Sequence, residues 1–289
     1  MIKETKIYQV LARIKRNVRL IIYPKPKAQY TYREFCKMLT KTKGTFFKYD
    51  EIDYHKTQRF PFELSDSFVR NKKVCFLRHD IDHDPFIALK MAKIEAEYKL
   101  FGSYYMLTTD TDIKKIWDKK RVKSLKALKE IQDLGHEVGF HYDLLGDYLE
   151  TGKDVGRICE QTLAEFRAAG IKVSGCVAHG SGRLSTYLSE KKIKDYPREC
   201  LNFNIWEESN EKPGMVELNN RKVNIPFLKL TDYGMRYEAY KVRRNYYHSD
   251  NGYVFWQHGD PIETINDKMD EGEVTCILVH PYVWRKNMG

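Results

Sequence analysis

Apolar strands and amphipathic helices alternate along the chain from Val74 onward. The apolar run at residues 74–80 is followed by a helical pattern at 84–100, where Asp84 can cap the helix and Pro85 suits its first turn. Further strands are predicted at residues 101–109, 136–143 and 171–180, with helices at 122–135 and 155–170 that each end at a glycine. This alternation is typical of βαβ units and predicts a parallel sheet or barrel.

The last third of the chain is less regular than the middle. Its apolar runs predict strands at residues 202–206, 216–220, 222–232, 252–259 and 274–284. No Gly/Ser/Pro-rich linker divides the chain. We therefore expect an α/β protein with an N-terminal helical extension over residues 1–70 and one barrel-like domain over 71–289.

Composition excludes several classes of protein. Hydrophobic residues make up 42% of the 289 residues and charged residues 31%, as in an ordinary globular protein. The formal charge is +10, but 40 acidic residues lie among the basic ones and no nucleic-acid-binding motif is present, so we expect no nucleic-acid partner. No apolar stretch is long enough to span a bilayer or to act as a signal peptide, which predicts a cytoplasmic location.

The cysteines are scattered through the sequence and form no CxxC pair. Several lie inside apolar runs, which favours reduced core thiols over a disulfide framework. They are Cys36, Cys75, Cys159, Cys176, Cys200 and Cys276.

The N-terminal segment at residues 6–22 predicts an amphipathic basic helix. Its apolar residues recur at helical spacing, with lysines and arginines between them. Such a helix could dock on the domain, or it could lie on an anionic membrane as a peripheral contact.

Polar side chains follow the predicted strands at the points where the strands end. They are Asp80, Asp82, His141, His179, Asp232 and His280. In β/α barrels the active site forms at the carboxyl ends of several strands at once. The sequence therefore predicts one convergent site rather than a scattered polar rim.

Aspartate and neutral histidine are suitable ligands for zinc and other divalent first-row ions. A metal held by Asp82 would lower the pKa of a bound water and polarise a carbonyl group. A second carboxylate nearby could accept the proton of the water, and a histidine on the opposite side could protonate the leaving group. These residue types therefore favour metal-assisted hydrolysis of an amide or ester.

Four segments together resemble a known family. They are "FLRHDID", "LGHEVGFHYD", "VAHGSG" and "ILVHP", within roughly residues 70–285. In this order and strand context they are similar to the polysaccharide deacetylases of carbohydrate esterase family 4, in a divergent branch with RHDxD as its first motif. The resemblance implies a distorted, incomplete (β/α) barrel and a metal-dependent deacetylase.

The resemblance also implies roles for individual residues. Asp80 falls on the position of the general base, and His280 on that of the general acid. The usual metal aspartate is replaced by Ile81, so Asp82 is the nearest substitute, and His141 matches the first metal histidine.

The chain departs from the family pattern at two positions. Leu145 stands where a second metal histidine is usual, and His179 is our preferred replacement. His83 and His79 remain alternatives, whereas His136 is expected to be structural. The arginine that usually orients the base is missing from "VAHGSG", and Arg78 or Arg183 could take its place.

Other polar and aromatic residues allow two interpretations. Asp232 and Arg236 could contact substrate, as could Arg78, or the first two could form a surface ion pair. The tryptophans Trp206, Trp256 and Trp284 are expected in the core, although a tryptophan can stack on a sugar ring. His55, His248 and His258 have no context that indicates a special role.

The leading hypothesis is a zinc-dependent enzyme that deacetylates an N-acetylated sugar. The sugar could be free or carried on a nucleotide, lipid or oligosaccharide, and the resemblance implies a role in surface polysaccharide biosynthesis. Two alternatives stay open: a glycan-binding or scaffold protein without catalysis on the same fold, and a hydrolase of another amide or ester.

Overall fold

The computed structural model describes residues 30–52, 60–108, 111–180, 202–207, 215–218, 221–224, 226–250 and 256–289. The strands are β1 (Gly44–Phe47), β2 (Lys73–Ile81), β3 (Ser103–Leu107), β4 (Glu137–Tyr142), β5 (Gly175–Ala178), β6 (Met215–Leu218), β7 (Arg221–Asn224), β8 (Tyr237–Glu238), β9 (Tyr246–Ser249) and β10 (Val274–Val279). The α-helices are α2 (Tyr32–Leu39), α3 (Asp66–Val69), α4 (Pro85–Glu97), α5 (Thr111–Asp133), α6 (Leu144–Thr151), α7 (Val155–Ala168), α9 (Pro261–Glu263) and α10 (Pro281–Trp284).

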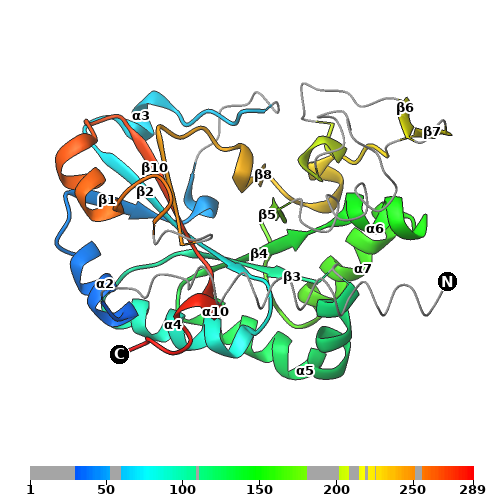
Figure 1. Ribbon diagram of the computed structural model, residues 1–289, viewed down its shortest axis with the longest axis horizontal. Coiled ribbons are helices and arrows are strands. Elements are labelled where there is room, and N and C mark those ends of the chain that lie inside the picture. Colours follow the sequence, from blue (N-terminus) through cyan, green and yellow to red (C-terminus); the bar gives the residue numbers. More distant parts are fainter. Residues whose placement is uncertain are drawn as a thin grey trace, which may run out of the picture.

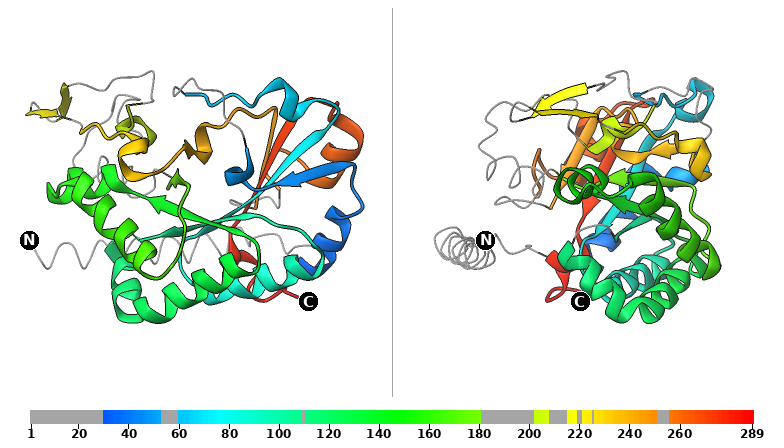
Figure 2. Two further views of the ribbon diagram at one scale, coloured as in Figure 1. Left: turned by 180° about the vertical axis from the view of Figure 1, so that it is seen from behind. Right: turned by 90° about the vertical axis from the view of Figure 1, so that its right-hand side faces the viewer.

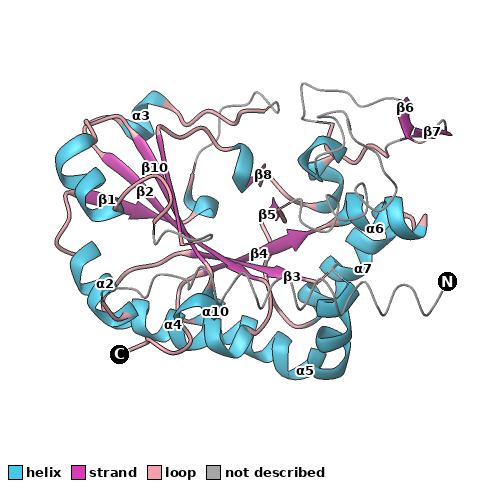
Figure 3. Ribbon diagram, in the orientation of Figure 1, coloured by secondary structure: helices cyan, strands magenta, loops and turns pink. Residues whose placement is uncertain are grey.

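One curved parallel sheet forms the body of the molecule (Figure 1). Its strand order is β8-β5-β4-β3-β2-β10-β9, and β1 also pairs with the first half of β2. Helices α4 and α5 cover the lower face of the sheet in this view, whereas α6 and α7 lie beside its far end (Figure 3). The edge strands β8 and β9 do not pair with each other, so the described strands form an open barrel. The expected α/β class and incomplete barrel are therefore confirmed.

A small antiparallel hairpin stands apart from this sheet. It consists of β6 and β7, which pair only with each other among the described strands. Both views of Figure 2 place the hairpin at the periphery of the molecule. It therefore contributes nothing to the curved sheet.

Strand β2 lies at the centre of the sheet and is buried on both sides. Phe76 points into the barrel, where its ring stacks on Tyr49 with the ring centroids 4.2 Å apart. Leu77 points the other way, into the apolar cluster beneath α2 and α4. Because side chains alternate along a strand, Arg78 and Asp80 follow Phe76 into the barrel while His79 follows Leu77 outward.

Aromatic rings fill the barrel at the amino ends of its strands. Phe76, Tyr105 and Tyr237 pack around Tyr49. Gly175 leaves space for one of these rings, because a Cβ at that position would lie 2.1 Å from the Tyr237 ring. This packed floor leaves the opposite end of the barrel, at the carboxyl ends of the strands, for a pocket.

The helix ends follow the expected capping chemistry. The Asp84 carboxylate accepts a hydrogen bond from the Phe86 N–H at 2.9 Å, with Pro85 in the first turn of α4. Asp154 caps α7 in the same way. Helix α5 begins at residue 111, earlier than the expected residue 122, and ends before Gly135, whose φ is +103°.

Several elements differ from the sequence expectation. Residues 44–47 form β1 within the main sheet, so the sheet begins before the expected domain boundary at residue 70. Residues 202–205 and 230–233 form short 3-10 helices rather than strands. Residues 256–259 form a turn in which Trp256 and His258 have positive φ.

Some sequence expectations concern parts of the chain that the structure does not describe. The amphipathic segment 6–22, His55, Arg183 and Cys200 lie outside the described residues. The other cysteines are all buried, namely Cys36, Cys75, Cys159, Cys176 and Cys276. Across the described residues, no helix has both the length and the apolar character that crossing a membrane requires.

Candidate active site

A polar pocket of about 510 Å³ opens at the carboxyl ends of the strands. The site residues expected from the sequence that line it are Arg78, Asp80, Asp82, His141, His179 and His280. They come from β2 and β4 and from the segments that directly follow β2, β5 and β10. Parallel pairing brings them to one edge, since all these strands run in the same direction.

Three of these side chains could hold a metal ion. One donor atom each from Asp82, His141 and His179 lies within 4.8 Å of the other two. Nδ1 of His141 donates to the Val177 carbonyl at 2.9 Å, which leaves Nε2 facing Asp82 Oδ1 at 3.4 Å. The hydrogen bond from Nδ1 to the Val177 carbonyl fixes the tautomer of His141, as is usual for a metal-ligating imidazole.

The Asp82 carboxylate supports the same interpretation. Its Oδ1 atom is buried and has no hydrogen-bond partner among the described residues. Burial would raise the pKa of Asp82, but the nearby His141 and His280 lower it. An ionised, buried oxygen beside two imidazoles suits a divalent cation, so the residues present fit a metal.

Asp80 is held by Arg78 rather than by the candidate metal ligands. The guanidinium donates from Nε to Oδ1 at 2.8 Å and from a terminal nitrogen to Oδ2 at 2.6 Å. Burial would raise the pKa of Asp80, but Arg78, with His141 and His280, brings it below the usual range. The carboxylate stays ionised and lies 3.6 Å from Nε2 of His141. It can therefore accept a proton beside the metal ligands.

His280 faces the group from the end of β10, which pairs with β2. Its Nδ1 donates to Asp250 Oδ1 at 2.6 Å, and its Nε2 lies 4.0 Å from Asp82 Oδ2. Burial would lower the pKa of His280, but Asp250, together with Asp82 and Asp80, raises it to about 9. The imidazole is therefore protonated near neutral pH and can donate a proton from Nε2.

Asp250 is a site residue that the sequence analysis missed. It directly follows β9, which pairs with β10 and was not among the predicted strands. Its Oδ2 accepts the His280 backbone N–H at 2.9 Å and the Trp284 indole N–H at 3.0 Å. The sequence could have indicated Asp250, because this aspartate directly follows the short segment "YYHS". Asp80 was recognised in the same way, as an aspartate at the end of a predicted strand.

Other polar residues of the pocket were also not anticipated. Asn202 donates to Asp143 Oδ1 at 2.8 Å and to the His179 carbonyl at 3.2 Å, and it accepts the Leu145 N–H at 3.0 Å. The pocket is also lined by Gln257 and by His258, which we expected to be ordinary. Asn202 therefore links the backbone of one candidate ligand to helix α6.

Leu145 lies in the apolar core and not in the candidate metal site. It belongs to α6, is fully buried and packs in the main apolar cluster. His179 reaches the candidate metal group from the end of β5 instead. The histidine that is usual at position 145 is thus replaced by a core residue.

The alternative ligands lie elsewhere. Nε2 of His79 lies 2.8 Å from Glu95 Oε1 on the outer face of the sheet. Nδ1 of His136 accepts the Gly102 N–H at 3.1 Å, and its Nε2 lies 3.0 Å from the Ala92 carbonyl. Both rings are buried beneath α4. His83 is exposed and lines a neighbouring pocket.

The structure does not bring Asp232 and Arg236 into the pocket. Asp232 is exposed in a 3-10 helix rather than at the end of a strand. The Arg236 guanidinium donates to the Asp50 carbonyl, and its backbone N–H donates to Ser174, which precedes β5. Arg236 therefore lies at the amino end of the sheet, opposite the site.

The tryptophans lie in the core. Trp206, Trp256 and Trp284 are all buried. The Trp206 indole donates to the Tyr142 hydroxyl at 2.8 Å, and Trp284 packs against Tyr32 with the ring centroids 5.0 Å apart. Their faces are therefore covered by protein.

Comparison with known proteins gives little beyond this geometry. No protein-family model matches the chain, and no curated protein is similar to it. Among solved structures, the chain is similar to a family 4 carbohydrate esterase from Bacillus anthracis, with 11% identity and a TM-score of 0.31. The likeness covers 84% of this chain and 76% of that one. Because a likeness this weak carries no argument, the function is inferred from the site.

Proposed function

We propose that the protein is a metal-dependent hydrolase that removes the acetyl group from an N-acetylated sugar. One observation carries the proposal: Asp82, His141 and His179 form a candidate metal group that Asp80 and His280 flank. An ionised carboxylate and a protonated imidazole around one group are the base and acid that amide hydrolysis needs.

Asp82, His141 and His179 would hold the metal. One carboxylate and two imidazoles leave a coordination position open, and this ligand set suits zinc. When bound, the metal would supply Lewis-acid activation of the amide carbonyl and of water.

Asp80 is the proposed general base. Its carboxylate would accept a proton from water as the oxygen of that water adds to the carbonyl carbon. The bidentate bond to Arg78 holds both oxygens in place and keeps the group ionised between turnovers. Arg78 therefore orients the base, the role that a different arginine fills in the family pattern.

His280 is the proposed general acid. Cleavage of the carbon–nitrogen bond leaves acetate and an amine, and Nε2 of His280 would supply the proton that the amine nitrogen takes up. Asp250 holds Nδ1 and so aims Nε2 into the pocket. The amino sugar and acetate are the products.

The proposed substrate is a sugar that is free or attached to a nucleotide, lipid or oligosaccharide. Motif resemblance to polysaccharide deacetylases supports this class. A role in surface polysaccharide biosynthesis is part of the same proposal. The pocket is polar and open, which suits a sugar ring better than an apolar amide.

Acetate release tests the proposal directly. Zinc-loaded protein should release acetate from N-acetylated oligosaccharides, and a chelator should stop the reaction until zinc is restored. O-acetylated sugars of the same length serve as the matched comparison. Release from the esters alone would indicate a different hydrolase, and glycan binding without release would indicate a binding protein.

A further inference from the structure

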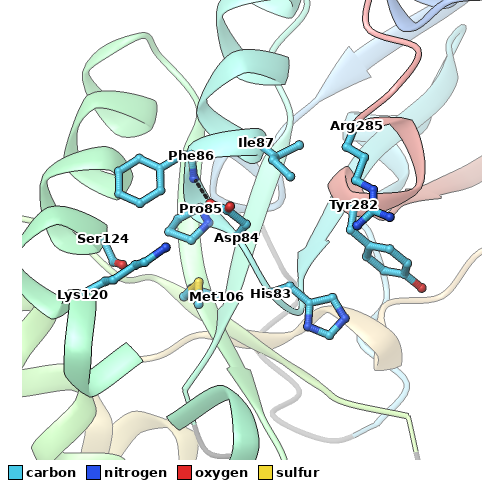
Figure 4. Close-up of a pocket in the computed structure, with 10 residues that line it drawn as sticks. All are labelled: His83, Asp84, Pro85, Phe86, Ile87, Met106, Lys120, Ser124, Tyr282 and Arg285. Atoms are coloured by element: carbon cyan, nitrogen blue, oxygen red, sulfur yellow. Dashed lines mark hydrogen bonds between the residues drawn. The ribbon is translucent and has the colours of Figure 1, made fainter. Parts of the chain in front are cut away.

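A second pocket of about 270 Å³ is lined by other residues, among them His83 and Tyr282, which are close in sequence to Asp82 and His280 (Figure 4). It lies where α4 and α10 begin, and α5 contributes Lys120 and Ser124. Its walls combine apolar surfaces from Phe86 and Met106 with charged side chains. None of the roles proposed above uses this pocket.

Neighbouring residues line the two pockets. Asp82 lines the first pocket and His83, the next residue, lines the second. The Tyr282 ring lines the second pocket, and its centroid lies 5.8 Å from the ring of His280, which lines the first, and 5.1 Å from the His83 ring. A ligand that extends from the reacting sugar past Tyr282 would therefore enter the second pocket.

Two cationic side chains in this pocket have no acidic partner among the residues that the structure describes. Lys120 and Arg285 are both exposed, and neither forms an ion pair with a described carboxylate. Figure 4 shows them on opposite sides of the turn at Asp84 and Pro85. Cations of this kind can attract an anionic ligand, and their attraction is strongest for groups that approach both.

The one carboxylate in the pocket is already engaged. Asp84 Oδ1 accepts the Phe86 N–H and caps α4. The lining therefore contains two cations and one carboxylate whose position is set by the helix, which leaves the pocket with an excess of positive charge.

We infer that this second pocket binds an anionic oxygen group, a phosphate or a carboxylate, attached to the sugar that occupies the main pocket. The inference rests on the proposed function, since the main pocket must hold the sugar. Lys120 and Arg285 provide the charge, and Tyr282 provides a surface between the two parts of the ligand. The anionic group would come from a sugar diphosphate or from a neighbouring uronic acid.

Calorimetric binding to the zinc-loaded full chain tests the inference without requiring turnover. The probes are UDP-N-acetylglucosamine for a diphosphate, a hyaluronan tetrasaccharide for carboxylates, and chitotetraose as the neutral comparison. Lys120→Ala and Arg285→Ala should each weaken the binding of an anionic probe about fivefold, and the loss should shrink at high salt. Chitotetraose binding should not change.

Matched controls separate a local charge effect from a general one. Lys123→Ala and Lys286→Ala remove exposed lysines next to the pocket that do not line it, so anionic binding should persist. Lys120→Arg and Arg285→Lys keep the charge and should restore binding if the alanine variants fold poorly.

The outcomes also separate this inference from the proposed function. Charge-dependent binding of an anionic probe by a protein that releases no acetate would support the second pocket and contradict the deacetylase. If acetate is released from every probe and neither Lys120→Ala nor Arg285→Ala changes that release, the deacetylase is supported and the second pocket is contradicted. The inference is overturned if neither anionic probe binds more tightly than chitotetraose, or if the alanine variants weaken all probes equally.

Discussion

Asp80 and Asp82 are two positions apart on the chain, yet their carboxylates have different partners. Asp80 is bonded on both oxygens by Arg78, whereas Asp82 faces His141 and has a buried oxygen without a hydrogen bond among the described residues. The arginine thus occupies the carboxylate that would act as base and leaves the other for a metal. The difference between them can be tested by substitution.

Asp82→Ala should lower the metal content, while Asp80→Asn should keep the metal and abolish acetate release. The reason is that only Asp82 belongs to the proposed ligand set. Metal analysis after dialysis and acetate assays on both variants check this. Equal metal loss in the two variants would show that the assignment is wrong.

His179 is the proposed third ligand, and its removal should be costly. His179→Ala should weaken metal affinity at least tenfold, which corresponds to about 1.4 kcal/mol. A competition titration with a metal-binding dye measures the change, with His83→Ala as the matched control because His83 is exposed and lies in the neighbouring pocket. An unchanged affinity in His179→Ala, or a larger loss in His83→Ala, would transfer the role to another residue.

At the scale of elements, the short edge strand β8 carries a buried carboxylate into the barrel wall. Glu238 Oε1 accepts the Ala178 N–H of β5 at 2.7 Å. Burial raises the pKa of Glu238 to about 7, although the Ala178 N–H and the charge of Arg78 oppose the shift. The folded state therefore holds this proton more tightly than the unfolded state, where the pKa is about 4.5.

This difference makes stability depend on pH. The stabilisation from the bound proton is fully present below pH 4.5 and is lost as pH rises through 7. Glu238→Gln mimics the protonated acid. At pH 8 its free energy of unfolding should therefore exceed that of wild type by up to about 3 kcal/mol. At pH 4.5 the two should be equally stable.

Urea unfolding of both proteins at a series of pH values measures the difference. Glu263→Gln is the control, because Glu263 is an exposed side chain and its replacement should leave the pH dependence unchanged. A constant difference between Glu238→Gln and wild type at all pH values would contradict the explanation.

At the scale of the whole molecule, the candidate ligands join segments that are distant in sequence. Asp82 follows β2, His141 lies on β4 and His179 follows β5. The unfolded chain cannot hold the three donors together, so a metal that binds them should stabilise the folded protein. At a free metal concentration of one hundred times Kd, the gain should be about 2.7 kcal/mol.

Thermal unfolding with and without zinc measures this effect, and Tm should rise with zinc concentration. His141→Ala removes a central donor and should remove most of the rise. The Lys123→Ala variant, changed on the surface of α5, should respond as wild type does. A zinc response that persists in His141→Ala would place the ion elsewhere.

The sequence by itself determined the central part of the fold. Regular spacing of apolar residues predicted the strands that became β2, β3, β4, β5 and β10 and the helices that became α4 and α7. The periodicity of apolar residues along each strand and helix, and the caps at Asp84 and Asp154, are local features that a sequence pattern can express. The same pattern placed Asp80, Asp82, His141, His179 and His280 at strand ends, and the parallel pairing of the strands then put them at one edge.

The tertiary structure alone decided which polar residues meet. Asp250 reached His280 because β9 pairs with β10, and Arg236 went to the opposite end of the sheet because its backbone bonds to the residue before β5. His79 met the Glu95 carboxylate on the outer face of the sheet, and Leu145 was buried in the core. Such outcomes depend on pairings between residues far apart in the chain. A local pattern contains no information about which of these distant segments pack together.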